Sequence, residues 1–262
     1  MKTWIPEERF LPYFTWKQVE ALPKDRSLII IPTAAIEQHG HHLPLATDTL
    51  INNYLLGHAL RKLPQAMPVF SVAPVCYGKS NEHIGFPGTL SLSRDTFMAV
   101  LHDLAASLHA GGFRKLVFFN SHGGNHSLLD VMARDLRAEF GLRIFCLFGG
   151  GAASGLGEQE AAYGFHAGEV ETSILLAATP ELVQRDKYTV NYIAQVGDPG
   201  VLKPEFAYAT YAWLTRDIAP SGVMGDPNPA SAEKGLKWCE EMSTRISRAL
   251  EEMYAYENLL KL

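Results

Sequence analysis

The hydrophobic residues of this chain gather in short segments that are separated by longer stretches of mixed polarity. Four short segments are typical of strands buried on both faces, and they cover 27–33, 69–75, 115–120 and 142–148. The longer stretches predict helices, at about 48–63, 94–109, 126–140, 169–178 and 229–258. Strands that alternate with helices in this way predict an α/β fold, in which a parallel sheet carries helices on both faces.

Cap and turn residues mark the ends of several elements. Ser93 is a favourable N-cap for the helix at 94–109, and Gly141 is a typical end for the helix at 126–140. A glycine- and alanine-rich stretch at 149–164 is expected to be a loop, and 188–228 is expected to be irregular. Because no repeat or linker divides the chain, we expect a single domain over 1–262.

Composition excludes several classes of protein. Of the 262 residues, 47% are hydrophobic and 19% are charged, and the net charge of −5 comes without the basic stripe of a nucleic-acid binder. The three cysteines are far apart and lack metal or redox spacing, which fits a reducing compartment. There is no apolar leader and no run long enough to span a bilayer. We therefore expect a soluble cytoplasmic protein with no nucleic-acid or membrane partner.

Three polar clusters stand where predicted strands give way to loops, and they hold five of the ten histidines. The clusters are Glu37-Gln38-His39-Gly40-His41-His42 with Asp48 after it, Asn120-Ser121-His122-Gly123-Gly124-Asn125, and His166-Ala167-Gly168-Glu169-Val170-Glu171. Ligands of parallel sheets bind beyond the carboxyl ends of the strands, so the clusters can converge at one rim. Imidazole and carboxylate groups bind zinc, manganese and iron(II). The pattern predicts a metal-dependent active site built from separate loops.

The first cluster offers a bridging arrangement. Glu37 and His39 are two residues apart in an extended segment, so their side chains point the same way. Asp48 stands at a predicted helix start, and its two oxygens could bridge two cations. The alternative interpretation is that Asp48 is only a helix cap and that the histidines are solvated loop residues.

The second cluster has a histidine in a glycine turn. Gly123 and Gly124 allow the backbone to approach a ligand closely, and the helix that begins after Asn125 favours negative charge at its start. An ordinary glycine-rich turn with an exposed His122 is the alternative.

The third cluster precedes a helix. Glu169 is explained by the helix dipole alone. Glu171 is followed by the apolar run Ile174-Leu175-Leu176, which suggests burial, and a buried carboxylate needs a partner such as a metal.

Taken together, these motifs resemble those of the creatininase family of metal hydrolases. The segments that carry the resemblance are Glu37-x-His39-Gly-x-His-Leu-Pro-x-x-Thr-Asp48, Glu82-His83-x-x-Phe-Pro-Gly-Thr89, Asn120-x-His122-Gly-Gly-Asn125 and His166-Ala-Gly-x-x-Glu171-Thr-Ser173. The resemblance implies a three-layer α/β/α sandwich, a two-metal centre and a homo-oligomer, often a hexamer. It also implies that Glu37, Asp48 and His122 hold one metal, and that His39 and the bridging Asp48 hold the second. We assign substrate contacts to Glu82, His83, Asn120, Gly123, Gly124 and Asn125.

Two departures from creatininase proper concern the substrate. That enzyme has a glutamate for the second metal where this chain has Gly124, and we expect Glu171 to supply the missing carboxylate. The creatinine-hydrolysing members enclose their substrate with tryptophans before the His166 position, but no tryptophan lies between Trp16 and Trp213. Creatinine is therefore expected to be a poor substrate.

The function implied is metal-dependent hydrolysis of a C–N amide in a cyclic amide, a formamide or a short peptide. Two divalent ions, zinc before manganese or iron(II), would activate water. Glu171 is expected to be catalytic as well as a ligand. His166 is expected to shuttle protons and to reach the metals when the loop before it closes over a small-molecule substrate. The alternatives are creatinine hydrolysis, hydrolysis of a cyclic polyol ketone, a nucleotide-dependent transferase that uses the glycines of 149–155, and a non-catalytic metal protein.

Overall fold

A central sheet of four parallel strands organises the chain. The computed structural model describes residues 3–150, 153–193, 201–205 and 207–256. The sheet has the order β2-β1-β3-β4, with bounds β1 Leu28–Thr33, β2 Val69–Ser71, β3 Lys115–Asn120 and β4 Arg143–Phe148. Thr33, Asn120 and Phe148 are register partners across β1, β3 and β4. These strands therefore end at the same edge, and the loops that follow leave the sheet together.

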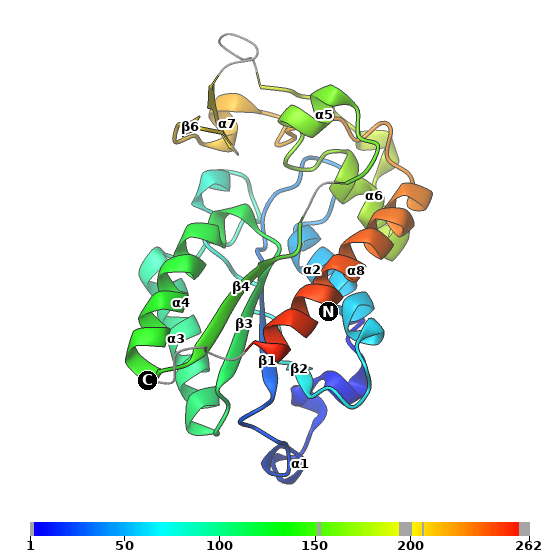
Figure 1. The fold of residues 1–262 in the computed structure, drawn as a ribbon. Coiled ribbons are helices and arrows are strands. Elements are labelled where there is room, and N and C mark those ends of the chain that lie inside the picture. Colours follow the sequence, from blue (N-terminus) through cyan, green and yellow to red (C-terminus); the bar gives the residue numbers. More distant parts are fainter. Residues whose placement is uncertain (1–2, 151–152, 194–200, 206, 257–262) are drawn as a thin grey trace.

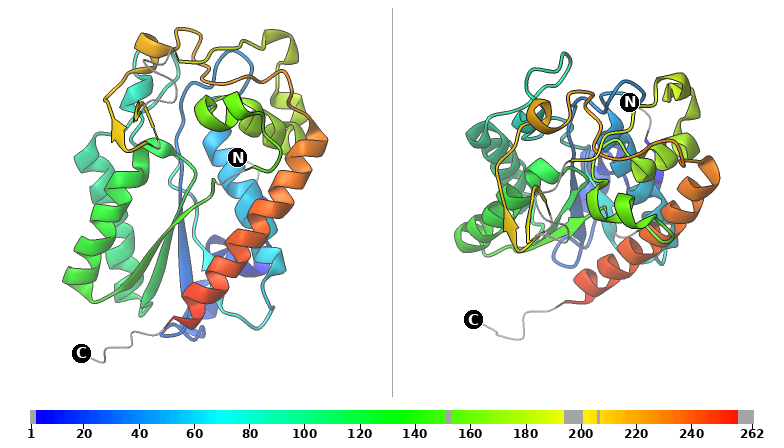
Figure 2. Two further views of the ribbon diagram at one scale, coloured as in Figure 1. Left: turned by 45° about the horizontal axis from the view of Figure 1, so that its top comes forward. Right: turned by 90° about the horizontal axis from the view of Figure 1, so that it is seen from above.

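Helices cover both faces of the sheet (Figures 1 and 2). One face carries α3 and α4, and the other carries α2, α6 and α8; the bounds are α2 Thr47–Lys62, α3 Arg94–Ala110, α4 His126–Phe140, α6 Glu169–Ala178 and α8 Ala232–Ala255. Alternate residues of β1 point to opposite layers: Ile30 belongs to the core under α2 and α8, whereas Ile29 and Ile31 belong to the core under α3. The expected three-layer α/β/α sandwich is confirmed.

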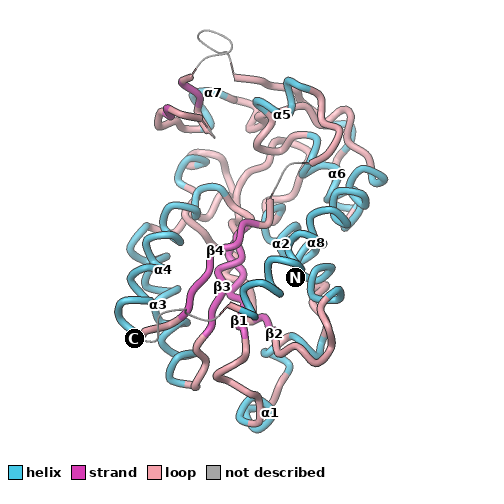
Figure 3. Tube along the Cα trace, viewed as in Figure 1, coloured by secondary structure: helices cyan, strands magenta, loops and turns pink. Residues whose placement is uncertain are grey.

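Short elements gather beyond the carboxyl edge of the sheet, where Figure 3 shows mostly loops. They include α5 Glu158–Tyr163, α7 Thr215–Ile218 and the two-residue strands β5 Leu202–Lys203 and β6 Ala209–Thr210. The sequence interpretation placed only loops and irregular chain here. Each of these elements is too short for a hydrophobic period to be visible, so the prediction was incomplete.

The remaining short elements lie elsewhere along the described chain. They are α1 Trp16–Glu20 and the 3-10 turns Glu7–Arg9, Leu11–Tyr13, Asn81–His83, Gly123–Asn125, Pro180–Leu182 and Arg185–Lys187. None of the described helices is long and apolar enough to cross a membrane.

Most predicted boundaries are close to the observed ones, and two differ for local reasons. Strand β2 stops at Ser71 although the prediction ran to Val75, because Pro74 has no N–H for a ladder and only an isolated bridge joins Val75 to Thr33. Helix α8 begins later than 229, since the Ser231 side chain accepts a hydrogen bond from the backbone N–H of Lys234 and so caps the helix. The predicted end of this helix near 258 lies outside the described residues.

A close contact between α6 and α8 fixes the helix that carries Glu171. A Cβ at Gly235 of α8 would overlap the carbonyl oxygen of Ser173 and would lie 2.5 Å from its carbonyl carbon. Only a residue without a side chain lets the two helices approach this closely.

We expect Gly235→Ala to destabilise the fold, although alanine is normally the better helix former by about 1 kcal/mol. The added methyl would push against backbone atoms, and such overpacking costs about 1–3 kcal/mol. Urea unfolding measures the free energy. Gly157→Ala is the matched control, because nothing lies within 4 Å of a Cβ built there. A Gly235→Ala variant as stable as the parent protein would show that α6 and α8 can separate without cost.

Candidate metal centre

The loop after β1 turns Glu37 and His39 into the same buried hollow. Each is 1% exposed, and Glu37 Oε1 lies 3.9 Å from His39 Nε2. The Nδ1 atom of His39 lies 3.2 Å from the carbonyl oxygen of Glu37. A carbonyl can only accept, so Nδ1 carries the hydrogen. Nε2 is thereby turned toward the carboxylates, as a metal ligand requires.

Asp48 lies between two imidazoles. Its Oδ1 is 3.2 Å from His39 Nε2, and its Oδ2 is 3.1 Å from His122 Nδ1. Asp48 is in the first turn of α2, whose N-cap is Ala46, and no side-chain capping bond is made there. The interpretation of Asp48 as a mere cap is therefore wrong, and one oxygen faces each of two potential ligand histidines.

His122 follows β3, and a backbone carbonyl on the side away from the carboxylates orients its ring. Its Nε2 lies 2.9 Å from the carbonyl oxygen of Lys79, so this nitrogen donates. Its Nδ1 faces Glu37 Oε2 at 3.3 Å as well as Asp48. The Ser80 hydroxyl donates to the same oxygen of Glu37. The loop at 79–80, remote in sequence from both ligands, thus holds a carboxylate and an imidazole in place.

Asn120 and Asn125 hydrogen-bond to backbone carbonyls of the site loops and do not line the cavity. The Asn120 amide donates to the carbonyl of His122 at 2.6 Å, and Asn125 donates to the carbonyl of Ala34 at 3.1 Å. Both side chains are buried, and neither lines the cavity above the site. Their expected role in substrate binding is corrected to one of fixing the His122 turn, whereas Gly123 and Gly124 do line the cavity.

The third sequence cluster, His166 to Glu171, lies at the start of α6 and contacts the first cluster. Glu171 Oε2 accepts a hydrogen bond from the backbone N–H of Ala167 at 2.6 Å and lies 3.9 Å from His39 Nε2. Glu169 instead forms an ion pair with Lys234 of α8, which agrees with its assignment as structural. The three sequence clusters therefore do meet at one edge of the sheet.

His166 is already inside the site. Its backbone pairs with Met224 in an antiparallel bridge, and its ring packs between those of His39 and His83 at centroid distances of 4.2 and 4.3 Å. Nε2 lies 2.9 Å from the carbonyl oxygen of Gln38, so Nδ1 is turned toward Glu37 Oε1 at 3.8 Å. The expected loop closure over the metals is not needed to bring His166 to them.

Three residues to which the sequence prediction gives little or no weight, His83, Gln38 and Thr215, surround the ligand groups. His83 is buried with Nε2 3.4 Å from Glu37 Oε1, and its Nδ1 lies 2.8 Å from both the Gln38 amide nitrogen and Thr215 Oγ1. The sequence prediction assigns no role to Gln38, although its position between Glu37 and His39 is a signal that it faces the site. Thr215 had no signal, because only the fold brings α7 to this place.

Carboxylates dominate the electrostatics of the site. Burial alone would lower the pKa of His39, but Asp48 and the other carboxylates raise it to about 10. The pKa of His122 is likewise raised against the effect of burial, by Glu37 and Asp48. Burial raises the pKa of Glu171 to about 7. The arrangement therefore attracts positive charge, as protons or as metal cations.

The donor set fits a divalent metal. Among the described buried side chains, His39 Nε2 and Asp48 Oδ2 lack hydrogen-bond partners although they are surrounded by ligand-type groups. Three overlapping sets have one ligand atom per residue within 4.8 Å of one another: Glu37, His39 and His166; Glu37, Glu82 and His122; and His39, Asp48 and Glu171. Oxygen and imidazole donors in this number suit zinc or manganese.

A cavity of about 1010 Å³ opens above these groups. Its floor holds Glu37, Asp48, His122 and Glu171, and its cover comes from α5 and from the β5–β6 segment. Trp213, which follows β6, also lines the cavity and packs edge-on against Phe165, with ring centroids 5.8 Å apart. A tryptophan thus does reach the site, although it comes from after His166 in the sequence and not from the loop before it.

Comparisons with known proteins agree with this geometry. The sequence model of the creatininase family, described as creatinine amidohydrolase, matches residues 12–250. A mycofactocin precursor peptide peptidase from Mycobacterium ulcerans is 36% identical over an alignment of 227 residues, which covers 84% of this chain and 83% of the relative. Creatinine amidohydrolase from Pseudomonas putida is 27% identical, with 94% and 97% of the two chains covered.

Solved structures show the same fold. A candidate creatinine amidohydrolase from Bacteroides fragilis superposes with a TM-score of 0.78 at 28% identity, over 98% of this chain and 100% of the other. A manganese form of creatininase superposes with a TM-score of 0.74 at 25% identity, over 95% and 99%. With a divalent-metal donor set at the edge of a three-layer sandwich, this chain belongs to the creatininase family and is one of its metal-dependent hydrolases.

Proposed function

We propose that this hydrolase cleaves an amide bond at the end of a short peptide and that it uses two divalent metal ions. The observation that carries the two-metal proposal is Asp48, whose two oxygens face His39 and His122 at 3.2 and 3.1 Å. One ion would be held by Glu37, Asp48 and His122, and the other by His39, Asp48 and Glu171. Bound there, the ions would supply the Lewis acidity that activates water and polarises a carbonyl.

Zinc is the metal we propose first, because the ligands are imidazole and carboxylate in small number; manganese and iron(II) are the alternatives.

The expectations of a homohexamer and of a cytoplasmic location also remain proposals. Sedimentation of the metal-loaded protein would test the hexamer.

The size of the cavity supports a peptide over a small ring. A cavity of about 1010 Å³ is at the upper end of the range that encloses whole drug-sized molecules, whereas creatinine has the size of one amino-acid side chain. The relative that shares 36% identity is named as a peptide peptidase. Incubation of the zinc-loaded protein with short peptides, lactams, formamides and creatinine, followed by mass spectrometry, separates these substrates. Faster turnover of creatinine than of any peptide would overturn the peptide proposal.

The residues of the chain have separable tasks in this reaction. Glu171 would serve as a ligand; in the metal-free site burial raises its pKa to about 7, so metal binding there would release a proton near neutral pH. His166 keeps Nε2–H on the Gln38 carbonyl, which leaves Nδ1 open toward the ligands. There it can accept a proton from the attacking water and pass it to the leaving amine. Burial and the neighbouring imidazoles hold the pKa of His166 well below its usual value, so it starts neutral.

Removal of the bridging ligand should empty both metal positions, whereas removal of Glu171 should empty one. We expect Asp48→Ala to retain no zinc after dialysis and Glu171→Ala to retain half the content of the parent protein, because the two proposed ligand sets share only Asp48. Elemental analysis gives the content. Glu169→Ala, in the same helical turn but paired with Lys234, is the control and should keep full content. Full zinc in Asp48→Ala would exclude the bridge.

Gly124 should be needed for the geometry of His122. A Cβ there would overlap Glu82 Oε1 and the carbonyl oxygen of Lys79, and would lie 2.6 Å from His122 Nε2. Gly124→Ala is therefore expected to weaken zinc affinity about tenfold or more, as loss of a partner that orients a ligand does. Calorimetry measures the affinity. Gly123→Ala is the matched control, since nothing lies within 4 Å of its Cβ. Equal affinities of the two variants would show that the site tolerates a side chain at 124.

His166 should be required for turnover and dispensable for metal. We expect His166→Ala to lose about 10²–10⁴-fold in kcat on the best peptide of the panel, which is the usual value of general acid–base help. Its zinc content should equal that of the exposed control His126→Ala. Loss of zinc together with activity would make His166 a ligand, which its place in one of the donor sets allows.

A further inference from the structure

The two helices that present metal ligands continue with apolar residues on the same face. Asp48 in the first turn of α2 is followed by Ile51 and Leu55, three and seven positions later. Glu171 in the first turn of α6 is followed by Ile174, three positions later. Residues at these spacings share a helix face, and all five line the same cavity. The part of the cavity beside the ligands, where α2 and α6 meet, is therefore lined by apolar side chains.

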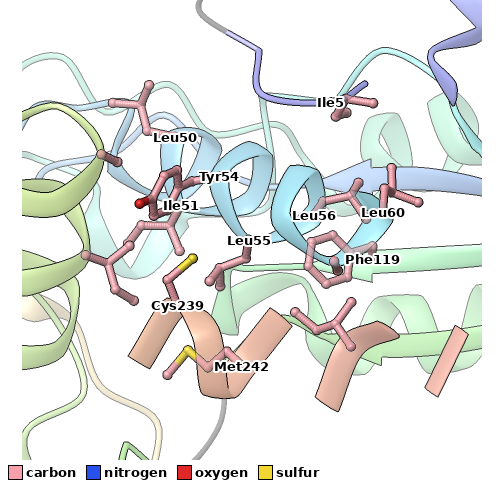
Figure 4. Packing of buried hydrophobic residues seen from close by; sticks show 14 of the residues in the cluster. Ile5, Leu50, Ile51, Tyr54, Leu55, Leu56, Leu60, Phe119, Cys239 and Met242 are labelled. Carbon is pink, nitrogen blue, oxygen red and sulfur yellow. The ribbon is translucent and has the colours of Figure 1, made fainter. Parts of the chain in front are cut away.

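Side chains from other parts of the chain close this space. We call it the apolar arm, and its described lining residues are Ile51, Leu55, Ala153, Leu156, Val170, Ile174 and Met242. Figure 4 shows Ile51 and Leu55 of α2 on the side that faces Met242 of α8. Leu55, Ile174 and Met242 are each no more than 3% exposed. Every one of these lining residues is hydrophobic, in contrast to the metal-ligand floor beside them.

We infer that the apolar arm binds an aliphatic or aromatic side chain of the substrate next to the scissile amide, an inference that rests on the proposed function. A substrate carbonyl placed over the ligands would have the arm within one helical turn. A hydrophobic side chain gains by leaving water there, whereas a charged one would lose its hydration without a partner. The opposite side of the cavity, with Lys203, Glu205 and Thr210, offers polar groups for the rest of the peptide.

Hydroxamates test the arm without knowledge of the substrate, because they chelate metal and carry a variable side group. The probes are acetohydroxamate, with a methyl group, and otherwise identical compounds with an isobutyl, a benzyl or an aminobutyl group. Calorimetry with the zinc-loaded protein should show the isobutyl and benzyl compounds binding about tenfold or more tightly than acetohydroxamate, in line with the selectivity of hydrophobic pockets. The aminobutyl compound should gain nothing over acetohydroxamate.

A pair of variants places the effect in the arm. Val170→Phe should fill the space and reduce the advantage of the benzyl over the methyl compound severalfold. Val170→Ala enlarges the arm with little risk to the fold and should shift preference from isobutyl toward benzyl. Val131→Phe is the matched control, because Val131 is 46% exposed on α4 and outside the cavity; it should bind all the probes as the parent protein does.

The possible failures are distinguishable. Failure of every hydroxamate, acetohydroxamate included, to bind the zinc-loaded protein would count against the proposed metal centre. Binding of acetohydroxamate with no preference among the side groups would overturn the apolar arm and leave the metal centre standing. A preference that persists unchanged in both Val170 variants would also overturn it, since the selectivity would then arise elsewhere in the cavity.

Discussion

Negative charge buried at the end of the sheet is the constraint on which the rest of this structure depends. Glu37 and Asp48 are 1% and 2% exposed, and each raises the free energy of ionising the other. Charges removed from water in this way persist only with opposite charge beside them. Protons on His39 and His122 can supply that charge, as the raised pKa of His39 shows. In the metal-free structure, however, Asp48 Oδ2 and His39 Nε2 make no well-aligned hydrogen bond. Divalent cations would satisfy both atoms and the charge together.

The parallel sheet meets this constraint through its register. Because β1 and β3 end level at Thr33 and Asn120, the loops that carry His39 and His122 leave from neighbouring points of one edge. Helices α2 and α6 then direct their first turns at the same place, where the positive end of each helix dipole favours the carboxylates of Asp48 and Glu171. The hydrogen on each imidazole is fixed by a carbonyl oxygen behind it. The imidazole nitrogens that face the carboxylates are thus oriented in the metal-free protein. Metal binding would therefore require little further ordering of these side chains.

The parts of this arrangement that local chemistry determines could be predicted from the sequence. Helix α4 was predicted with its observed bounds, since an unbroken pattern ends at Gly141, which adopts the left-handed conformation. The convergence of the three clusters followed from strand–helix alternation. Contacts over long separations could not be predicted: Gln38 meets His166 across 128 positions, and Thr215 meets His83 across 132. Asn120 and Asn125 were assigned to substrate because a polar residue in a glycine turn has the same sequence signature whether it faces a ligand or holds the turn.

Gly124 connects the choice of ligands to the shape of the cavity. The space that a side chain at this position would need is already taken by the Glu82 carboxylate and the Lys79 carbonyl. A glutamate at 124, as in creatininase proper, and Glu82 in its present position therefore exclude each other. With Glu82 in that space, a carboxylate for the His39 side of the site has to come from another element, and Glu171 is 3.9 Å from His39 Nε2. In the proposed ligand set, Glu171 of α6 would also bring the apolar face of that helix to the metals. On that proposal, the glycine at 124 and the apolar side chains beside Glu171 belong to one arrangement.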